Sequence, residues 1–172
     1  MATDLGLQRN FRQGQKFWAE GQTIHFQFHT DVRNALYIWA AYYSNGEINS
    51  KLTATAKSPS TSPQSIAYNN QALIRFKHIS VGVRHYLKGN AFMEKGWGLY
   101  SITGFGVILG RAINNYSTPI DSTLYNTLLP SGKANFKRLT LDLGLGYEKN
   151  LGGTLSVYTD LRCWIPTTDY PS

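Results

Sequence analysis

The fold is decided by residues 138–147, which read RLTLDLGLGY. Four leucines and a final tyrosine occupy every second position, and the positions between them carry Arg, Thr, Asp and two Gly. Successive side chains of a β-strand point to opposite faces, so this alternation predicts a strand with one apolar and one polar face. The alternation returns at 154–165, after the short stretch NLGG at 150–153. The two runs therefore predict an antiparallel hairpin.

Two further pairs of strands show the same pattern upstream. They span 23–30 with 35–43, and 73–87 with 97–112. The connections alternate in kind, with short ones at 31–34, 88–96 and 150–153 and long ones, rich in Ser, Thr, Asn and Pro, at 44–72 and 113–137. Such alternation places all the long loops at one end of the sheet. We predict an all-β fold in a single domain of residues 1–172, an antiparallel up-and-down β-barrel with about six strands visible.

The composition excludes several classes of protein. Charged residues form 16 % of the 172-residue chain, against the roughly 25 % that is usual for soluble domains. There are 17 Lys and Arg against 10 Asp and Glu, and the 8 Phe, 11 Tyr and 4 Trp give 23 aromatic residues. No apolar run is long enough for a membrane-spanning helix. The lone Cys163 excludes an intrachain disulfide and a thiolate zinc site, and we expect no cofactor.

The residues on the polar faces indicate which side of the sheet lies inside. Six glycines share these faces with Thr, Ser, Asp, Tyr and Arg, a mixture suited to a narrow polar interior: Gly82, Gly104, Gly106, Gly110, Gly144 and Gly146. Several candidate strands reach or exceed the roughly 9–11 residues that cross a bilayer at a tilt. Both observations favour a transmembrane barrel with its apolar face toward lipid. The alternative is a soluble, lipocalin-like barrel whose apolar face lines a pocket for a small ligand.

Three stretches carry a resemblance to a known family. Residues 79–87 (ISVGVRHYL), 98–107 (GLYSITGFGV) and 141–147 (LDLGLGY) are similar in strand style to the small outer-membrane β-barrel proteins of Gram-negative bacteria. The resemblance covers about residues 22–165. It implies eight strands in the complete protein, short turns at the periplasm, long loops outside, and location in the outer membrane among lipid and lipopolysaccharide.

The directions of the strands leave the ends of this barrel open. With the short turns at the periplasm, one upward strand should precede residue 23 and one downward strand should follow residue 172. Residues 1–20 alternate poorly. We therefore expect a fragment that lacks one or both end strands. A strand from a partner, or closure by the N-terminal segment, is the competing expectation.

Two groups of charged residues are candidates for function. Arg75, Lys77, Arg111 and Lys137 lie near the outer ends of their strands, where the resemblance implies contact with lipopolysaccharide phosphates. The alternative for these four residues is a solvated rim. Arg84, Asp142, Asp160 and Arg162 fall on the inward side and should pair with one another, because an isolated charge in a confined interior is costly. Their pairing would form a plug, and the alternative is a pathway for ions.

One arrangement could carry chemistry. His78 and Ser80 are two residues apart on one strand, so they share a face, and a nearby carboxylate would complete a base-assisted serine nucleophile. Outer-membrane lipid A deacylases look similar in carrying His-x-Ser on a barrel strand. The sequence departs from that pattern because the pair points inward, Val81 follows the serine where Asn is expected, and the acid is unassigned, with Glu94 downstream.

Other sites are disfavoured by spacing. His25 and His29 are four residues apart on a strand, about 13 Å at the usual rise and too far for one metal. The basic residues do not gather on one face with aromatic residues, so we expect no nucleic-acid partner. We expect a structural or binding role at the cell envelope and no enzyme activity. Loops 44–72 and 113–137 would carry the specificity, toward lipid or an envelope protein partner.

Overall fold

The fold is a single curled antiparallel sheet, seen in a computed structural model that describes residues 2–9, 16–153 and 155–167. The strands run in the order β1-β2-β3-β4-β5-β7-β8, and the two-residue β6 pairs with the far end of β3. Their bounds are Ala2–Arg9 (β1), Lys16–His29 (β2), Asn34–Ala56 (β3), Ser65–Lys88 (β4), Gly96–Tyr116 (β5), Tyr125–Asn126 (β6), Gly132–Gly152 (β7) and Leu155–Pro166 (β8). The all-β, antiparallel, up-and-down prediction is confirmed in these residues.

The strands are longer and more numerous than the sequence analysis predicted. The stretch 44–72 is not a long loop, because β3 continues to Ala56 and β4 begins at Ser65. Likewise β5 reaches Tyr116 and β7 begins at Gly132, which shortens the predicted loop 113–137. The sequence predicted only that part of 48–57 could extend a hairpin beyond the main sheet, because a bulge between Tyr43 and Gly46 shifts the register and breaks the alternation, with Asn45 at φ 60°.

The N-terminal segment also contains more strand than the sequence predicted. β1 pairs with β2 from Ala2↔Thr23 to Arg9↔Lys16, so β2 begins seven residues before the predicted start at 23. This supplies the upward strand that the topology requires before residue 23. The described part of the chain offers no helix with the length and hydropathy that a bilayer crossing needs.

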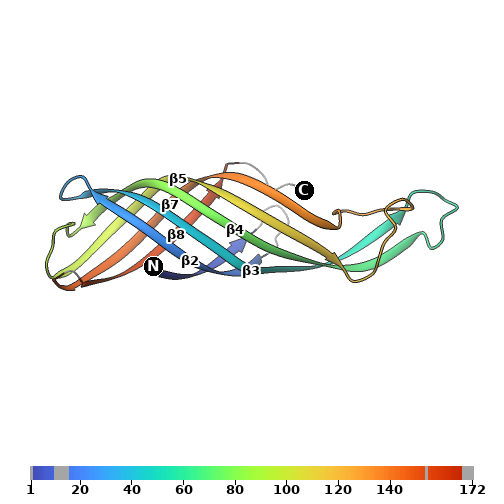
Figure 1. Cartoon of the computed structure of the whole chain (residues 1–172), viewed down its shortest axis with the longest axis horizontal. Coiled ribbons are helices and arrows are strands. Elements are labelled where there is room, and N and C mark those ends of the chain that lie inside the picture. Colours follow the sequence, from blue (N-terminus) through green and yellow to red (C-terminus); the bar gives the residue numbers. More distant parts are fainter. Residues whose placement is uncertain (1, 10–15, 154, 168–172) are drawn as a thin grey trace.

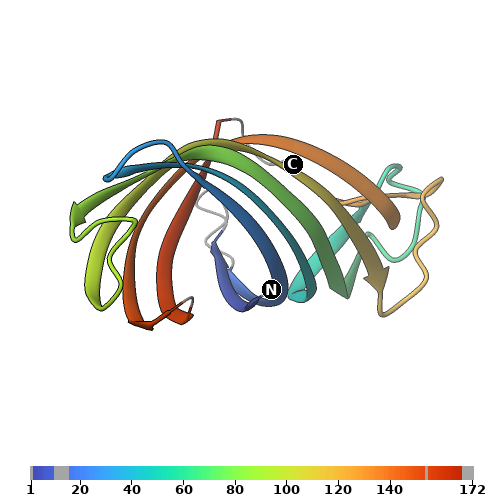
Figure 2. The ribbon, with the colours of Figure 1, turned by 60° about the vertical axis from the view of Figure 1, so that its left-hand side comes forward.

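Over the described residues, the sheet curls into a half-barrel with a strand at each edge that is unpaired on its outer side. Figure 2 shows the strands arching over a concave side, with β1 and β8 as the outermost strands of the sheet. Seven strands alternate in direction along this path, so β1 and β8 point the same way. A single strand antiparallel to both edges would therefore continue the alternation from one to the other.

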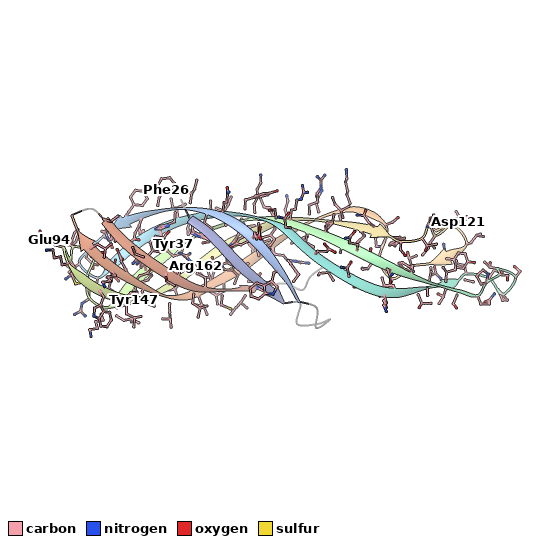
Figure 3. The ribbon with its side chains drawn as sticks, turned by 90° about the horizontal axis from the view of Figure 1, so that it is seen from below. Phe26, Tyr37, Glu94, Asp121, Tyr147 and Arg162 are labelled. Atoms are coloured by element: carbon pink, nitrogen blue, oxygen red, sulfur yellow. The ribbon has the colours of Figure 1, made fainter. Side chains whose placement is uncertain are left out.

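The concave face holds the main core. Its buried residues are mainly aromatic and come from β2 to β5, with Trp164 of β8 packed against them. Figure 3 shows Tyr37 and Arg162 between the walls of the sheet, whereas Phe26 and Tyr147 project outward. The convex face is apolar and exposed, with Phe26 60 %, Phe105 69 % and Leu161 76 % accessible. Large apolar side chains are thus exposed outside the sheet, while aromatic and charged side chains share its inside.

A second, smaller core lies beyond the barrel wall, where β3, β4, β5 and β7 extend past the bulge (Figure 1). Ala54, Tyr68 and Tyr125 are buried there, with five further apolar side chains packed around them: Leu52, Ala56, Ile66, Tyr116 and Ile120. The hydroxyl of Tyr125 donates to the carbonyl of Pro63 at 3.0 Å. We call this region the extended end, and the end with the turns at 30–33 and 89–95 the short-turn end.

Candidate functional site

The interior of the half-barrel contains a charged network around Arg84 on β4. One guanidinium nitrogen donates to Oε1 of Gln27 at 2.6 Å, and another pairs with the carboxylate of Glu148 on β7. The hydroxyl of Tyr86 also donates to Glu148, at 2.9 Å. The guanidinium carbon lies 3.3 Å from the ring centre of Tyr100. These contacts tie β2, β4, β5 and β7 together across the concave face.

A second ion pair lies on β8. Nη2 of Arg162 is 3.0 Å from Oδ2 of Asp160, and the hydroxyl of Tyr100 donates to Oδ1 of the same carboxylate. The guanidinium of Arg162 also stacks on Trp39 and Tyr37 of β3, with its carbon 5.0 and 5.2 Å from the ring centres. Side chains of β8 therefore reach those of β3 across the interior.

The four charged residues predicted to pair inside do lie on the concave face, but they do not form one cluster. Arg162 and Asp160 pair with each other, whereas Arg84 pairs with Glu148 and Asp142 lies beside His78. The sequence analysis missed Glu148 because it ended the strand at Tyr147. Glu148 continues the inward series of Asp142 and its glycines, and that parity could have identified it.

His78 and Asp142 form a third polar group, in the middle of the interior. Nε2 of His78 lies 3.0 Å from the hydroxyl oxygen of Thr140, and that hydroxyl donates to Oδ1 of Asp142 at 2.7 Å. Nε2 is also 3.5 Å from Oδ2 of Asp142. His78, Thr140, Asp142 and Ser80 are each no more than 1 % exposed. Because these polar groups are buried, their hydrogen bonds to one another matter for the stability of the fold.

His78 and Ser80 both point into the interior, where the imidazole is enclosed by other side chains. The Nε2 atom of His78 contacts Thr140 and Asp142, and the rings of Trp39 and Trp164 pack against the imidazole. The acid that the sequence left unassigned is Asp142, which lies beside the histidine. Figure 3 shows Glu94 at the short-turn end, whereas His78 pairs with Ala41 and Ile108 within the sheet.

Glycines make the interior networks possible. Tyr37, Gly82 and Gly104 lie in register on β3, β4 and β5, and a Cβ on Gly82 would fall 2.8 Å from the Tyr37 ring. The side chain of Tyr37 thus lies over Gly82 and Gly104. In the same way Tyr100 crosses Gly146 in register and reaches Asp160 on the next strand. The predicted interdigitation of large and small inward residues is therefore seen directly.

The outward basic residues come together on three adjacent strands. Arg75 of β4 is directly opposite Arg111 of β5. In the next row of outward-facing residues toward the short-turn end, Lys77 of β4, Leu109 of β5 and Lys137 of β7 lie side by side in register. All four cations are exposed on the convex face. We call Arg75, Lys77, Arg111 and Lys137 the basic cluster.

An apolar band begins next to the basic cluster, on its side toward the short-turn end. The next row holds Ile79, Val107 and Leu139 in register. A shallow groove opens beside this row, lined by Gln22, Thr23, Ile24, Ala40, Ala41, Tyr42, Lys77 and Ile79. Charged groups above an apolar band are typical of a surface that meets both water and lipid.

No family model, curated protein or solved structure matches the chain. Among residues 2–9, 16–153 and 155–167, no group of three or more His, Cys, Asp or Glu side chains could hold a metal ion. The two faces of the sheet differ in the apolar and charged side chains that they carry.

Proposed function

We propose that this sheet forms the wall of a transmembrane up-and-down β-barrel in the outer membrane of a Gram-negative bacterium. The observation that carries the proposal is the exposure of large apolar side chains outside the sheet together with the burial of charged ones inside it. Large apolar side chains such as Phe105 and Leu161 are exposed on the convex face, while Arg84, Asp142 and His78 are buried on the concave face. A bilayer would cover the exposed apolar face, and its removal from water would stabilise the fold.

In this proposal the closed barrel has eight strands, which are β1–β5, β7, β8 and one further strand between β8 and β1. β1 and β8 point the same way, so one strand that runs antiparallel to both would close the sheet with an unbroken alternation. Closure matters in lipid, because each unpaired N–H or C=O group at a sheet edge would cost about 2–7 kcal/mol there. A strand that pairs with both edges would therefore make the inserted barrel more stable.

The role of the barrel is structural or binding. Aromatic and charged side chains from β2, β3, β4, β5, β7 and β8 meet across the interior, which favours a plug over an ion pathway. The extended end, with its own core, would present the turn 57–64 and the connection 117–131 outside the cell for a ligand or an envelope protein. We propose no catalytic activity.

A soluble barrel with a ligand pocket is the alternative from another class. In that alternative the apolar series from Leu139 to Tyr147 would line the pocket, but Leu139, Leu143, Leu145 and Tyr147 are exposed on the convex side. The concave side carries the ion pairs of Arg84 and Arg162. The side chains therefore support the membrane barrel better than the lipocalin-like one.

Refolding with and without lipid tests the proposal. The protein would be diluted from urea into buffer or into phosphatidylcholine vesicles, with β-structure followed by far-UV circular dichroism and mass in matched detergent by light scattering. We expect a folded β monomer only when lipid or detergent is present. A folded monomer in buffer alone would overturn the membrane assignment.

A further inference from the structure

We propose that the basic cluster binds the phosphate of a lipid headgroup, while an acyl chain of the same lipid lies in the neighbouring apolar groove. The inference rests on the proposed function, because the convex face must meet a bilayer for a lipid to approach it this way. The partner of this surface of the barrel would be a phosphate-bearing lipid.

The cluster brings like charges together. Arg75 and Arg111 face each other directly on adjacent strands, where Cβ atoms are about 4.5–5.5 Å apart and equal charges destabilise the sheet. Lys77 and Lys137 flank Leu109 one row away. None of the four cations forms an ion pair with a carboxylate in the part of the chain that the structure describes. An anion bound between them would relieve this repulsion.

Two outward carboxylates on β2 and β3 do not neutralise the cluster. Glu47 accepts hydrogen bonds from Asn49 at 2.7 Å and from Gln71 at 2.9 Å, both toward the extended end. Glu20 lies on β2 with β3 between it and Arg75, and these two described side chains form no ion pair. The space between Arg75, Lys77 and Arg111 therefore carries net positive charge.

The dimensions of the cluster suit phosphate. Neighbouring strands are about 4.8 Å apart, so Lys77 and Lys137 are separated by about 10 Å across β5. Arginine can bind phosphate through two parallel N–H donors, and lysine adds a mobile point charge. A headgroup with one phosphate would contact Arg75, Arg111 and one lysine, and a second phosphate would reach the other lysine.

The groove provides the apolar half of the site. Ile24, Ala40 and Ile79 lie in register on β2, β3 and β4, and the small side chain of Ala40 leaves a hollow between the two isoleucines. Tyr42 and Lys77 stand at the head of the hollow, one row nearer the extended end. A chain lying over Ala40 would thus carry its headgroup to Lys77, and both halves of an amphiphile are matched by adjacent surfaces.

The test compares two lipids of equal chain length on the intact protein. Phosphatidic acid and phosphatidylcholine would be offered together in detergent, and lipids that stay bound would be counted by mass spectrometry of the intact complex. We expect a preference of at least about tenfold for phosphatidic acid, since each basic residue near an anionic lipid is worth about 1 kcal/mol. The quadruple variant R75Q/K77Q/R111Q/K137Q should lose this preference.

A matched control removes the same charge at the short-turn end. The variant R33Q/K88Q/K95Q/K149Q also neutralises four exposed cations, and it should keep the preference for phosphatidic acid. Ala40→Leu, which fills the groove, should weaken retention of both lipids without changing their ratio. Equal retention of the two lipids by the unchanged protein, or equal effects of the two quadruple variants, would overturn the lipid site.

Insertion into vesicles of phosphatidylcholine alone separates this inference from the proposed function. A protein that inserts but shows no preference for phosphatidic acid contradicts the lipid site and leaves the barrel proposal intact. A protein that does not insert contradicts both.

Discussion

The hydroxyl of Thr140 on β7 lies 3.0 Å from Nε2 of His78 on β4, although β5 runs between the two strands. The contact is possible because Gly106 of β5 has no side chain at the crossing point. A Cβ at Gly106 would lie 2.8 Å from the Thr140 hydroxyl and closer still to the imidazole. The absence of one side chain thus lets two others meet.

Gly106→Ala should therefore destabilise the protein without changing its surface. The added methyl group must displace buried polar atoms, and overpacking of this kind costs about 1–3 kcal/mol. Urea unfolding in detergent, followed by tryptophan fluorescence, would measure the loss. Val107→Ala alters the neighbouring outward position and should cost less. An equal or smaller loss for Gly106→Ala would contradict the proposed crossing.

Arg84→Leu should be more damaging than the removal of both members of its ion pair. The single variant leaves the Glu148 carboxylate, which is 18 % exposed, without its cation. Breaking a buried pair in this way costs about 3–5 kcal/mol. The double variant R84L/E148L should recover part of that loss, and a double-mutant cycle on the free energy of unfolding would measure the coupling. Additive losses would show that the two side chains do not interact.

Part of this arrangement could be predicted from the sequence, because alternation assigns each residue to a face. The alternation around Leu139 placed Asp142 inside, and the same parity placed His78 and Ser80 inside. Partners across the sheet could not be predicted, since they depend on register. The contact between His78 and Thr140 requires that β4, β5 and β7 align Ser80, Gly106 and Thr140 in one row.

The full length of the extended strands escaped prediction for a local reason. The bulge at Tyr43 to Gly46 reverses the parity of β3, so the polar residues that follow read as a loop. Tyr68 and Tyr125 are separated by 57 positions in the chain, and nothing local to either residue indicates that they share a core.

Tyr125→Ala should loosen the extended end while the barrel wall stays folded. The substitution removes a buried ring from the small core and its hydrogen bond to Pro63. Its contacts lie beyond the bulge, away from the main core. Hydrogen exchange should rise in 52–56 and 65–69 and stay unchanged in 78–84. Faster exchange throughout the sheet would show that the two cores unfold together.

The connection at Asp121 should respond to acid. Hydrogen bonds from the hydroxyl of Thr123 at 2.6 Å and its backbone N–H at 2.8 Å hold the pKa of Asp121 below its ordinary value of 3.8. A carboxyl group whose pKa is lowered by folding stabilises the fold above pH 3.8, and this contribution is lost as the pH falls through the lowered pKa. An NMR titration of the Asp121 carboxyl carbon would measure the shift. Thr123→Ala should raise the pKa back toward 3.8, and an unchanged pKa would contradict these contacts.

The central claim, that the convex face meets lipid, can be tested at the single native cysteine. Cys163 lies on β8 and is exposed on the same side as Leu161 and Ile165. A fluorescent probe attached to Cys163, in protein refolded into phosphatidylcholine vesicles, would be exposed either to a quencher carried on the acyl chains or to iodide in the water. A probe at Ser60→Cys in a Cys163→Ser background, at the extended end, is the control. We predict that the acyl-chain quencher reaches only the probe at Cys163. Quenching of that probe by iodide, with no response to the quencher in the bilayer, would contradict the account.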